Sequence, residues 1–315
     1  MKKQIKYIDE IHRLRKEKNA IILAHYYQTA DIQDIADFIG DSLALSQKAA
    51  ENDADIILFA GVKFMAETAK ILAPDKKVLL PDMNAGCSLA DSCRAEDFEK
   101  FIRVNPGRTI ITYVNTTAEI KALSDICCTS SNAVEIVNSL SHEEKIIFAP
   151  DRNLGNYVQK LTGRDIVVWN GTCHVHEEFS IESIIKLKAE HPEAKVIVHP
   201  ECELPVRMIA DFIGSTSALL KFVTNDKSMR YIVATESGIL YQMKKAEPEK
   251  SFIPAPPRDS TCGCNECNFM KLITVEKIYN CLLNEKPEII LDADIIKKGL
   301  KPIKRMLDIS GKKGK

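Results

Sequence analysis

The chain has 315 residues, of which 45% are hydrophobic and 28% charged, and its formal net charge is −1. This composition is typical of a soluble globular protein of about two ordinary domains, and it gives no indication of a nucleic-acid or membrane partner. No segment reaches the roughly 18 consecutive apolar residues that a membrane span needs. We therefore expect a cytoplasmic protein.

The N-terminal residues predict an amphipathic helix rather than a signal peptide, because Ile5, Ile8, Ile11 and Leu14 follow helical spacing. Three groups of apolar runs come next. The first is "AIILAHYYQ" from 20, "DIILFAGV" from 55 and "KVLLPDMNAGC" from 77. The second is "TIITYVNTT" from 109, "KIIFAPDR" from 145 and "DIVVWNGTC" from 165. The third is "KVIVHPECE" from 195, "RYIVATES" from 230 and "KSFIPAPPRDSTCGCNEC" from 250. Short β-branched runs that alternate with helical patterns indicate buried parallel strands.

An internal repeat accompanies these groups. The hexamer "IADFIG" occurs at 35–40 and 209–214, and the related "LSDICCTS" lies between them at 123–130. We therefore predict an α/β fold of three homologous three-layer α/β/α sandwich domains, with parallel sheets arranged around a pseudo-threefold axis. The first predicted domain is 1–88 plus 268–315, because we expect the terminal helices to pack on the first unit. The second is 89–174 and the third is 175–267.

Polar residues follow the first strand of each unit, where open parallel sheets bind ligands. These candidate site residues are His25, Tyr26, Tyr27, Tyr113, Val114, Asn115, His199, Pro200, Glu201 and Cys202. Glu201 shares a strand face with His199 and is the best candidate for a general base, with a pKa that burial is expected to raise. Tyr27 and Tyr113 can transfer protons through their phenols, or else serve only in packing.

The third strand of each unit leads to a cysteine: Cys87, Cys173 and one of Cys262, Cys264 or Cys267. A cubane iron–sulfur cluster normally takes four cysteines, so three would leave one iron open to polarise a substrate oxygen. The alternative is a local metal site of Cys262, Cys264 and Cys267. This alternative leaves the matching positions of Cys87 and Cys173 unexplained. We favour the dispersed set. The remaining cysteines are assigned to packing: Cys93, Cys127, Cys128, Cys202 and Cys281.

Hydroxyl residues follow the repeats where the next helices should begin. Ser42, Ser130, Ser215 and Thr216 are candidate N-cap and anion-binding residues, the alternative being plain helix caps. Three such positions favour a polyanionic substrate. Of the two histidines after Cys173, we expect His176 rather than His174 to point into the site.

Seven motifs occur in the order seen in the quinolinate synthase family, and they span nearly the whole chain: "AHYYQ", "GDSL", "YVNTTAEIKA", "CTSSNAV", "PDRNLG", "HPEC" and "GSTS". This resemblance implies three α/β/α domains around a pseudo-threefold axis and one 4Fe–4S cluster held by three cysteines. It also implies condensation of iminoaspartate with dihydroxyacetone phosphate to quinolinate in NAD biosynthesis, with release of phosphate and two waters. The L-aspartate oxidase that supplies the imine is a candidate transient partner.

The resemblance implies that the cluster ligands are Cys87, Cys173 and Cys267, and that air destroys activity. It implies binding of substrate anions by His25, Ser42, Ser130 and Thr216, with Ser215 nearby. Tyr113 and Asn115 would bind a carboxylate beside His199 and Glu201, and the proton-transfer groups would be Tyr27, Glu201, His176 and Tyr113. The spacing "CGCNEC" departs from the C-x-x-C-x-x-C of some members, so no redox-switch role follows for Cys262 and Cys264.

Two other readings stay open on the sequence. One is a cysteine-rich metal-binding or redox-sensing protein without catalysis. The other is a 4Fe–4S hydro-lyase that acts on a different substrate.

Overall fold

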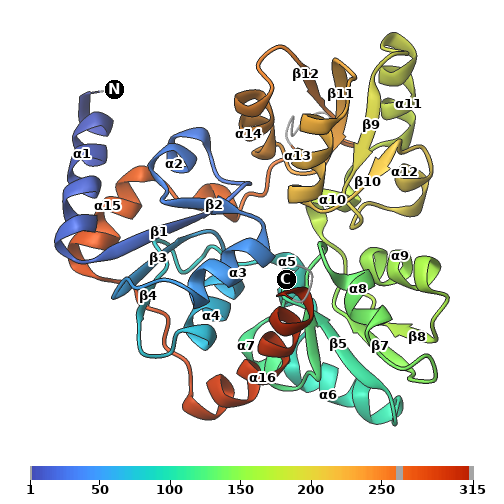
Figure 1. Cartoon of the computed structure of the whole chain (residues 1–315), viewed down its shortest axis with the longest axis horizontal. Helices are drawn as coiled ribbons and strands as arrows, with labels where there is room; N and C mark the ends of the chain where they lie inside the picture. Colours follow the sequence, from blue (N-terminus) through green and yellow to red (C-terminus); the bar gives the residue numbers. More distant parts are fainter. Residues whose placement is uncertain (1, 260–264, 312–315) are drawn as a thin grey trace.

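The computed structural model describes residues 2–259 and 265–311, so Cys262 and Cys264 lie outside the described residues. Three parallel four-stranded sheets form three lobes (Figure 1). The first sheet contains β1 (Ala20–His25), β2 (Phe38–Gly40), β3 (Ile56–Ala60) and β4 (Lys77–Leu79). The second contains β5 (Thr109–Tyr113), β6 (Ile126–Cys128), β7 (Ile146–Ala149) and β8 (Ile166–Val168). The third contains β9 (Lys195–Val198), β10 (Phe212–Ile213), β11 (Arg230–Ala234) and β12 (Ser251–Pro254).

The three sheets have the same strand order, which is β2-β1-β3-β4 in the first, β6-β5-β7-β8 in the second and β10-β9-β11-β12 in the third. All of their strand pairs are parallel. The predicted α/β class with parallel sheets is therefore confirmed. All nine predicted runs contain strands, but the sequence analysis missed the fourth strand of each sheet, which is formed by the repeat itself.

The repeat has a structural explanation in this edge strand. The carboxylates of Asp37, Asp125 and Asp211 accept hydrogen bonds from the backbone N–H of Ile22, Ile110 and Val196, at 2.8, 2.8 and 2.7 Å. The N–H of each aspartate donates in return to the carbonyl of the same partner residue. The aspartate thus sets the register between the edge strand and the first strand of each sheet.

The glycine that ends the hexamer is required by close packing. A Cβ at Gly40 would lie 2.9 Å from the Cβ of Ala44, and one at Gly214 would lie 2.9 Å from the Cβ of Ala218. Both distances are shorter than real Cβ contacts, so a side chain here would push the following helix away from the strand.

Replacing Asp211 by alanine is expected to lower the free energy of unfolding by about 1 kcal/mol, because the Val196 N–H loses its charged acceptor at the strand edge. Asp211→Asn, which keeps an acceptor, should lose less. The midpoint of denaturant unfolding measures both changes, with the exposed Asp53→Ala as control. Equal midpoints for Asp211→Ala and the control would contradict this role.

The helices surround and connect these sheets. The first lobe begins with α1 (Lys2–Glu17), α2 (Ala30–Ile35), α3 (Ser42–Ala50), α4 (Lys63–Leu72) and α5 (Ser88–Asp91). The second sheet is accompanied by α6 (Ala95–Val104), α7 (Ala118–Ala122), α8 (Ala133–Asn138) and α9 (Arg152–Thr162). The third has α10 (His174–Glu177), α11 (Ile181–Glu190), α12 (Leu204–Met208), α13 (Thr216–Asn225) and α14 (Ile239–Ala246). The chain continues through η2 (Met270–Leu272), α15 (Val275–Asn284) and α16 (Ala293–Gly311).

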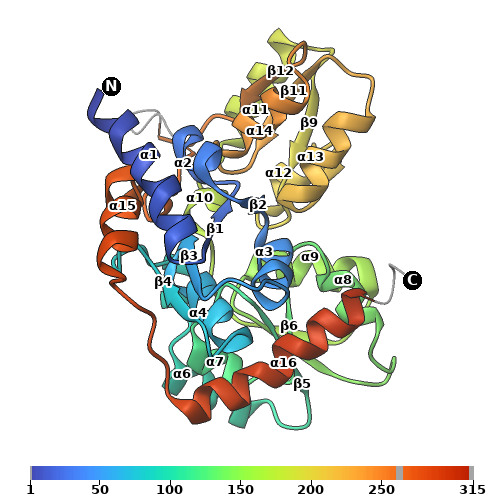
Figure 2. The same ribbon diagram turned by 60° about the vertical axis from the view of Figure 1, so that its left-hand side comes forward.

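The terminal helices pack on two different lobes. Helix α15 packs against α1, as Figures 1 and 2 show. Helix α16 packs against α7, α8 and β6 of the second lobe and also against α4 of the first, rather than on the first unit alone. Its buried residues Gly299, Ile303 and Met306 follow helical spacing, so one stripe of α16 covers both lobes. None of the helices in the described ranges is long and apolar enough to cross a membrane.

Candidate active site

One cavity lies where the carboxyl ends of the three sheets meet, and side chains from all three lobes line it. Most of the predicted site residues are part of its lining: His25, Tyr27, Ser42, Cys87, Tyr113, Asn115, Ser130, Cys173, His176, His199, Glu201, Thr216 and Cys267. Val114, Pro200 and Ser215 are buried but are not among the lining residues. The cavity also contains Asp41, Thr129, Ser131 and Glu236, which the sequence analysis did not select.

Three cysteine thiols reach this cavity from equivalent places in the three units. Cys87 and Cys173 are the residues before α5 and α10, and Cys267 lies shortly before η2. Burial raises the pKa of all three, that of Cys87 to about 12, and the charge of a neighbouring thiolate raises the pKa of Cys87 and Cys173 further. Free thiols here would stay protonated, so a shared set of thiolates needs a cationic metal centre to stabilise it.

This donor set fits an iron–sulfur cluster better than it fits a single ion. In the part of the chain that the structure describes, the group of metal-binding donors within 4.8 Å of one another contains Cys173 but neither Cys87 nor Cys267, so the three thiols do not form one compact group. Thiolates that bind different corners of a cubane lie farther apart than thiolates on one ion. The surrounding Val62, Phe64, Met65, Val175 and Met270 are apolar, which suits a cluster that has to be kept from water.

The other five cysteines of the described ranges are buried away from the cavity lining: Cys93, Cys127, Cys128, Cys202 and Cys281. The thiol of Cys202 donates to the carbonyl of Ala234 at 3.4 Å. Their burial agrees with a role in packing.

Glu201 is the centre of the polar network. Its Oε2 lies 3.0 Å from Nδ1 of His176 and its Oε1 lies 3.9 Å from Nδ1 of His199. The hydroxyl of Tyr113 also forms a hydrogen bond with this carboxylate. All of these side chains are buried.

The expected rise in the pKa of Glu201 is wrong. Burial by itself raises this pKa, but the imidazoles of His176 and His199 and the Tyr113 hydroxyl stabilise the carboxylate more, and the pKa falls to about 2. Burial lowers the pKa of His199 to about 3 and that of His25 to about 4, so both imidazoles are neutral at neutral pH. Glu201 is thus an ionised base among neutral donors.

A chain of hydroxyl groups connects Tyr27 with this carboxylate. The Tyr27 hydroxyl lies 3.2 Å from Oγ1 of Thr216 and 2.7 Å from Oγ1 of Thr235. The same Thr235 oxygen lies 3.0 Å from Nε2 of His176, whose other ring nitrogen contacts Glu201. Protons can therefore pass between Tyr27 and Glu201 through three short steps, by way of Thr235 and His176.

His176 lines the cavity as predicted, whereas the ring of His174 bonds to the hydroxyl of Ser88 at 2.8 Å. The two residues belong to the short helix α10 and so point in different directions. Of these two histidines, His176 is therefore the one that lines the cavity, as the sequence predicted. The segment that carries it is a short helix.

Of the predicted N-caps, only Ser215 is confirmed; Ser42, Ser130 and Thr216 do not cap their helices. Asp41, not Ser42, caps α3 by accepting from the Ala44 N–H at 3.0 Å, and Ser42 is the first helical residue. Ser215 does cap α13, while α8 begins after Asn132, beyond Ser130. An acidic side chain competes well for this position, because Asp and Ser are similarly favoured N-caps.

Ser131 connects the starts of the three helices through hydrogen bonds. Its hydroxyl donates to the Asp41 carboxylate at 2.6 Å and lies 2.8 Å from Oγ of Ser215. This contact joins the first, second and third repeats at one point beside the cavity. Ser42, Ser130 and Thr216 line the cavity, where Ser130 contacts His199 and Thr216 contacts Tyr27.

Glu236 holds the segment that carries Cys267. The carboxylate accepts from the Cys267 N–H at 3.1 Å and from the Gly238 N–H at 2.7 Å, and it pairs with Lys271 at 2.8 Å. Lys271 also donates to the Tyr27 carbonyl at 2.7 Å. The pair therefore fixes a thiol of the third unit to a strand end of the first.

We expect Glu236→Gln to release iron to a chelator several-fold faster than the parent protein under anaerobic conditions, because the buried carboxylate no longer holds the Cys267 segment through Lys271. Glu266→Gln is the matched control, since Glu266 is exposed and adjacent to Cys267. Equal release rates for the two variants would show that Glu236 does not support this segment.

Comparison with known proteins gives one consistent result. Residues 9–308 match the family described as quinolinate synthetase A protein. The chain is 60% identical to a quinolinate synthase of Microcystis aeruginosa over 300 residues, which are 95% of this chain and 94% of the relative. It is 59% identical to the quinolinate synthases of a Synechococcus species and of Nostoc punctiforme, again over 95% of this chain and over 94% and 92% of those proteins.

Proposed function

Because the chain belongs to the quinolinate synthase family, an enzyme family of NAD biosynthesis, we propose that the cavity between the three sheets is its active site. There the enzyme condenses iminoaspartate with dihydroxyacetone phosphate to form quinolinate, with release of phosphate and two waters. One observation carries this proposal: three dispersed cysteines and the Glu201 network line the same cavity.

Cys87, Cys173 and Cys267 would hold one 4Fe–4S cluster per chain, because their three thiols are the cysteine donors of the cavity. When bound, such a cluster supplies an open iron that acts as a Lewis acid on a substrate oxygen. Exposure of that iron makes the enzyme sensitive to oxygen.

The substrate-binding groups are proposed from their position in the lining. Both substrates are anions, and the neutral His25 with the hydroxyls of Ser42, Ser130 and Thr216 can donate to phosphate or carboxylate oxygens. Ser42 and Thr216 are the first residues of α3 and α13, where free N–H groups also favour anions.

Asn115 gives separate support for this assignment. Its buried Oδ1 has no hydrogen-bond partner among the residues that the structure describes, although the residue lines the cavity. This oxygen is an acceptor, so a donor on the substrate, such as its nitrogen, would recover the free energy that the unpaired atom costs, while the amide nitrogen of Asn115 would donate to a carboxylate. We therefore propose that the side chains of Asn115 and Tyr113 bind the dicarboxylic substrate, with Val114, Pro200 and Ser215 supporting the site from behind its lining.

The proton-transfer groups follow from the network. Glu201 is ionised and accepts a proton from the substrate, while His176 and Tyr113 hold its carboxylate in place. Tyr27 can return a proton through Thr235 and His176. Neutral His199 donates toward Ser130, 3.2 Å away, and so orients that hydroxyl.

The wider arrangement is also proposed. We assign the domains 1–88 plus 268–315, 89–174 and 175–267, related by a pseudo-threefold axis, with α16 bridging the first two. Proteins whose thiols must stay reduced usually work in the cytoplasm, so the proposed location is cytoplasmic, where L-aspartate oxidase could deliver the unstable imine by transient contact.

Anaerobically purified, iron-loaded protein is expected to form quinolinate when iminoaspartate and dihydroxyacetone phosphate are both present, and none when either is omitted. Prolonged exposure to air should abolish this activity. Iron-loaded protein that forms no quinolinate would favour a hydro-lyase with a different substrate. Protein whose iron survives air would favour a non-catalytic metal-binding role.

A further inference from the structure

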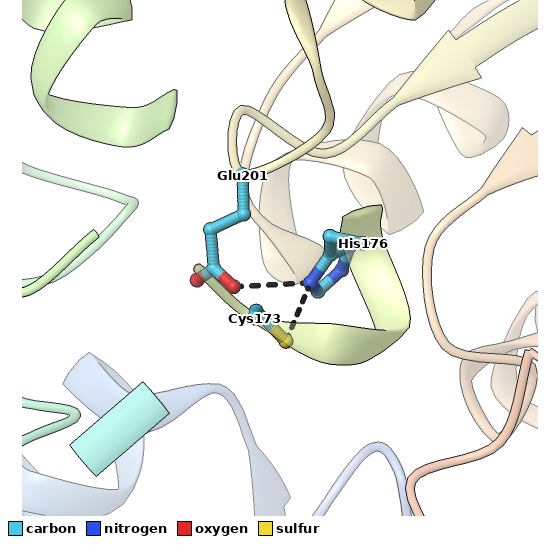
Figure 3. A group of neighbouring side chains, drawn as sticks. All are labelled: Cys173, His176 and Glu201. Atoms are coloured by element: carbon cyan, nitrogen blue, oxygen red, sulfur yellow. Dashed lines mark hydrogen bonds and ion pairs between the residues drawn. The ribbon is translucent and has the colours of Figure 1, made fainter. Parts of the chain in front are cut away.

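A second kind of metal site lies inside the cavity. Cys173, His176 and Glu201 form a group whose ligand atoms all lie within 4.8 Å of one another. Figure 3 shows the three side chains pointing toward a common point, with one ring nitrogen of His176 between the sulfur and the carboxylate. Two of the residues are almost completely buried and Cys173 is partly buried, so the group is not a chance cluster on the surface.

The distances match those of a single small ion. Nδ1 of His176 lies 3.3 Å from Sγ of Cys173 and 3.0 Å from Oε2 of Glu201. Ligands of a tetrahedral zinc ion lie roughly 3.4–3.6 Å apart when the usual zinc–ligand bond lengths are applied. The two contacts of His176 therefore need to lengthen by only a few tenths of an ångström to hold such an ion, and the sulfur and the carboxylate lie within 4.8 Å of each other.

Neighbouring groups orient these donors for a metal. Nε2 of His176 lies 3.0 Å from the Thr235 hydroxyl. When a metal ion replaces the proton between Nδ1 and Glu201, the remaining ring proton on Nε2 can be donated to this hydroxyl. The Tyr113 hydroxyl holds the Glu201 carboxylate from the other side. Histidine ligands of zinc typically have such a hydrogen bond on their second nitrogen.

We propose that, in the absence of the cluster, Cys173, His176 and Glu201 bind one divalent metal ion of the zinc type, with a fourth position open to the cavity. One sulfur, one imidazole and one carboxylate are ligands that zinc and cobalt accept, and three protein ligands plus an open position are common in zinc sites. Because Cys173 belongs to both sets, this ion and the cluster exclude each other. The proposal does not depend on the reaction that the enzyme catalyses.

Cobalt is a suitable probe, because a thiolate ligand gives Co²⁺ a charge-transfer absorption band. Protein freed of iron under anaerobic conditions is expected to bind one Co²⁺ per chain with this band. His176→Ala and Glu201→Gln should each weaken the binding at least tenfold, and Cys173→Ser should remove the band. Cys87→Ser and Cys267→Ser should bind cobalt like the parent protein, although neither would hold a complete cluster.

The opposite pattern would overturn the proposal. Loss of cobalt binding in Cys87→Ser would place the ion among the three dispersed thiols. If Cys267→Ser loses cobalt binding while His176→Ala binds cobalt normally, the ion belongs to the local group of Cys262, Cys264 and Cys267. Circular dichroism of each variant shows whether it is folded, and quinolinate formation by the cluster-loaded parent protein tests the proposed function separately.

A second measurement uses the shared cysteine. One equivalent of Zn²⁺ added before reconstitution is expected to slow iron incorporation into the parent protein several-fold, and to have little effect on the rate in folded His176→Ala. Equal slowing in both proteins would contradict a zinc ion at His176.

Discussion

Replacing Cys87 by serine is expected to remove nearly all cluster iron and to reduce quinolinate formation to background. Cys87 is the only cysteine of the first unit in the cavity lining among the described residues, and a serine hydroxyl is a far weaker iron ligand than a thiolate. Iron and sulfide analysis, the visible absorption of the cluster and the anaerobic assay measure the change together.

Cys281→Ser is the matched control for this variant. Cys281 is buried in α15 and packs in the apolar core of the first lobe, outside the cavity lining. The Cys281→Ser variant should keep the parental iron content and activity per folded molecule. Its free energy of unfolding should fall somewhat, because the substitution buries a hydroxyl group. Full cluster content in Cys87→Ser would refute the dispersed ligand set and favour the local cysteine group near Cys267.

Replacing Glu201 by glutamine is expected to lower kcat by about 10²–10⁴-fold while the cluster remains bound. The amide has nearly the same shape, but it cannot accept a proton from the substrate. The neutral amide also weakens the 3.0 Å contact with Nδ1 of His176. Single-turnover measurement of quinolinate, with the visible spectrum of the cluster recorded in the same sample, separates a lost base from a lost cofactor.

Glu203→Gln provides the comparison for this substitution. Glu203 lies two residues further along the chain, is partly exposed and pairs with Arg258 rather than with a cavity residue. It should retain parental kcat. A fall in kcat of similar size in both variants would show that Glu201 has no special role.

The sequence predicted the parts of the fold that repeat. Each of the nine predicted runs contains a strand, although β12 has no buried residue, and the equivalent positions of Cys87 and Cys173 in two units led to the cavity. The strands β2, β6 and β10 were missed because they are only two or three residues long. Nothing in so short a segment distinguishes an edge strand from the turn before a helix.

The site residues that escaped prediction depend on contacts between units. Thr235 and Glu236 follow β11, which is the second of the three strands predicted for the third unit. The strand-end candidates had been chosen only at the ends of the first and third predicted strands. The pKa of Glu201 was misjudged because burial can be inferred from one segment, but its partner His176 comes from helix α10, a separate segment of the same unit. Such pairings appear only when the separate segments are placed together in the fold.

Iron-edge anomalous diffraction from anaerobically grown crystals of the cluster-loaded protein shows which sulfurs bind the iron. We expect one iron cluster per chain, bonded to the sulfurs of Cys87, Cys173 and Cys267. Iron bonded to Cys267 and its near neighbours, with free thiols at Cys87 and Cys173, would contradict it.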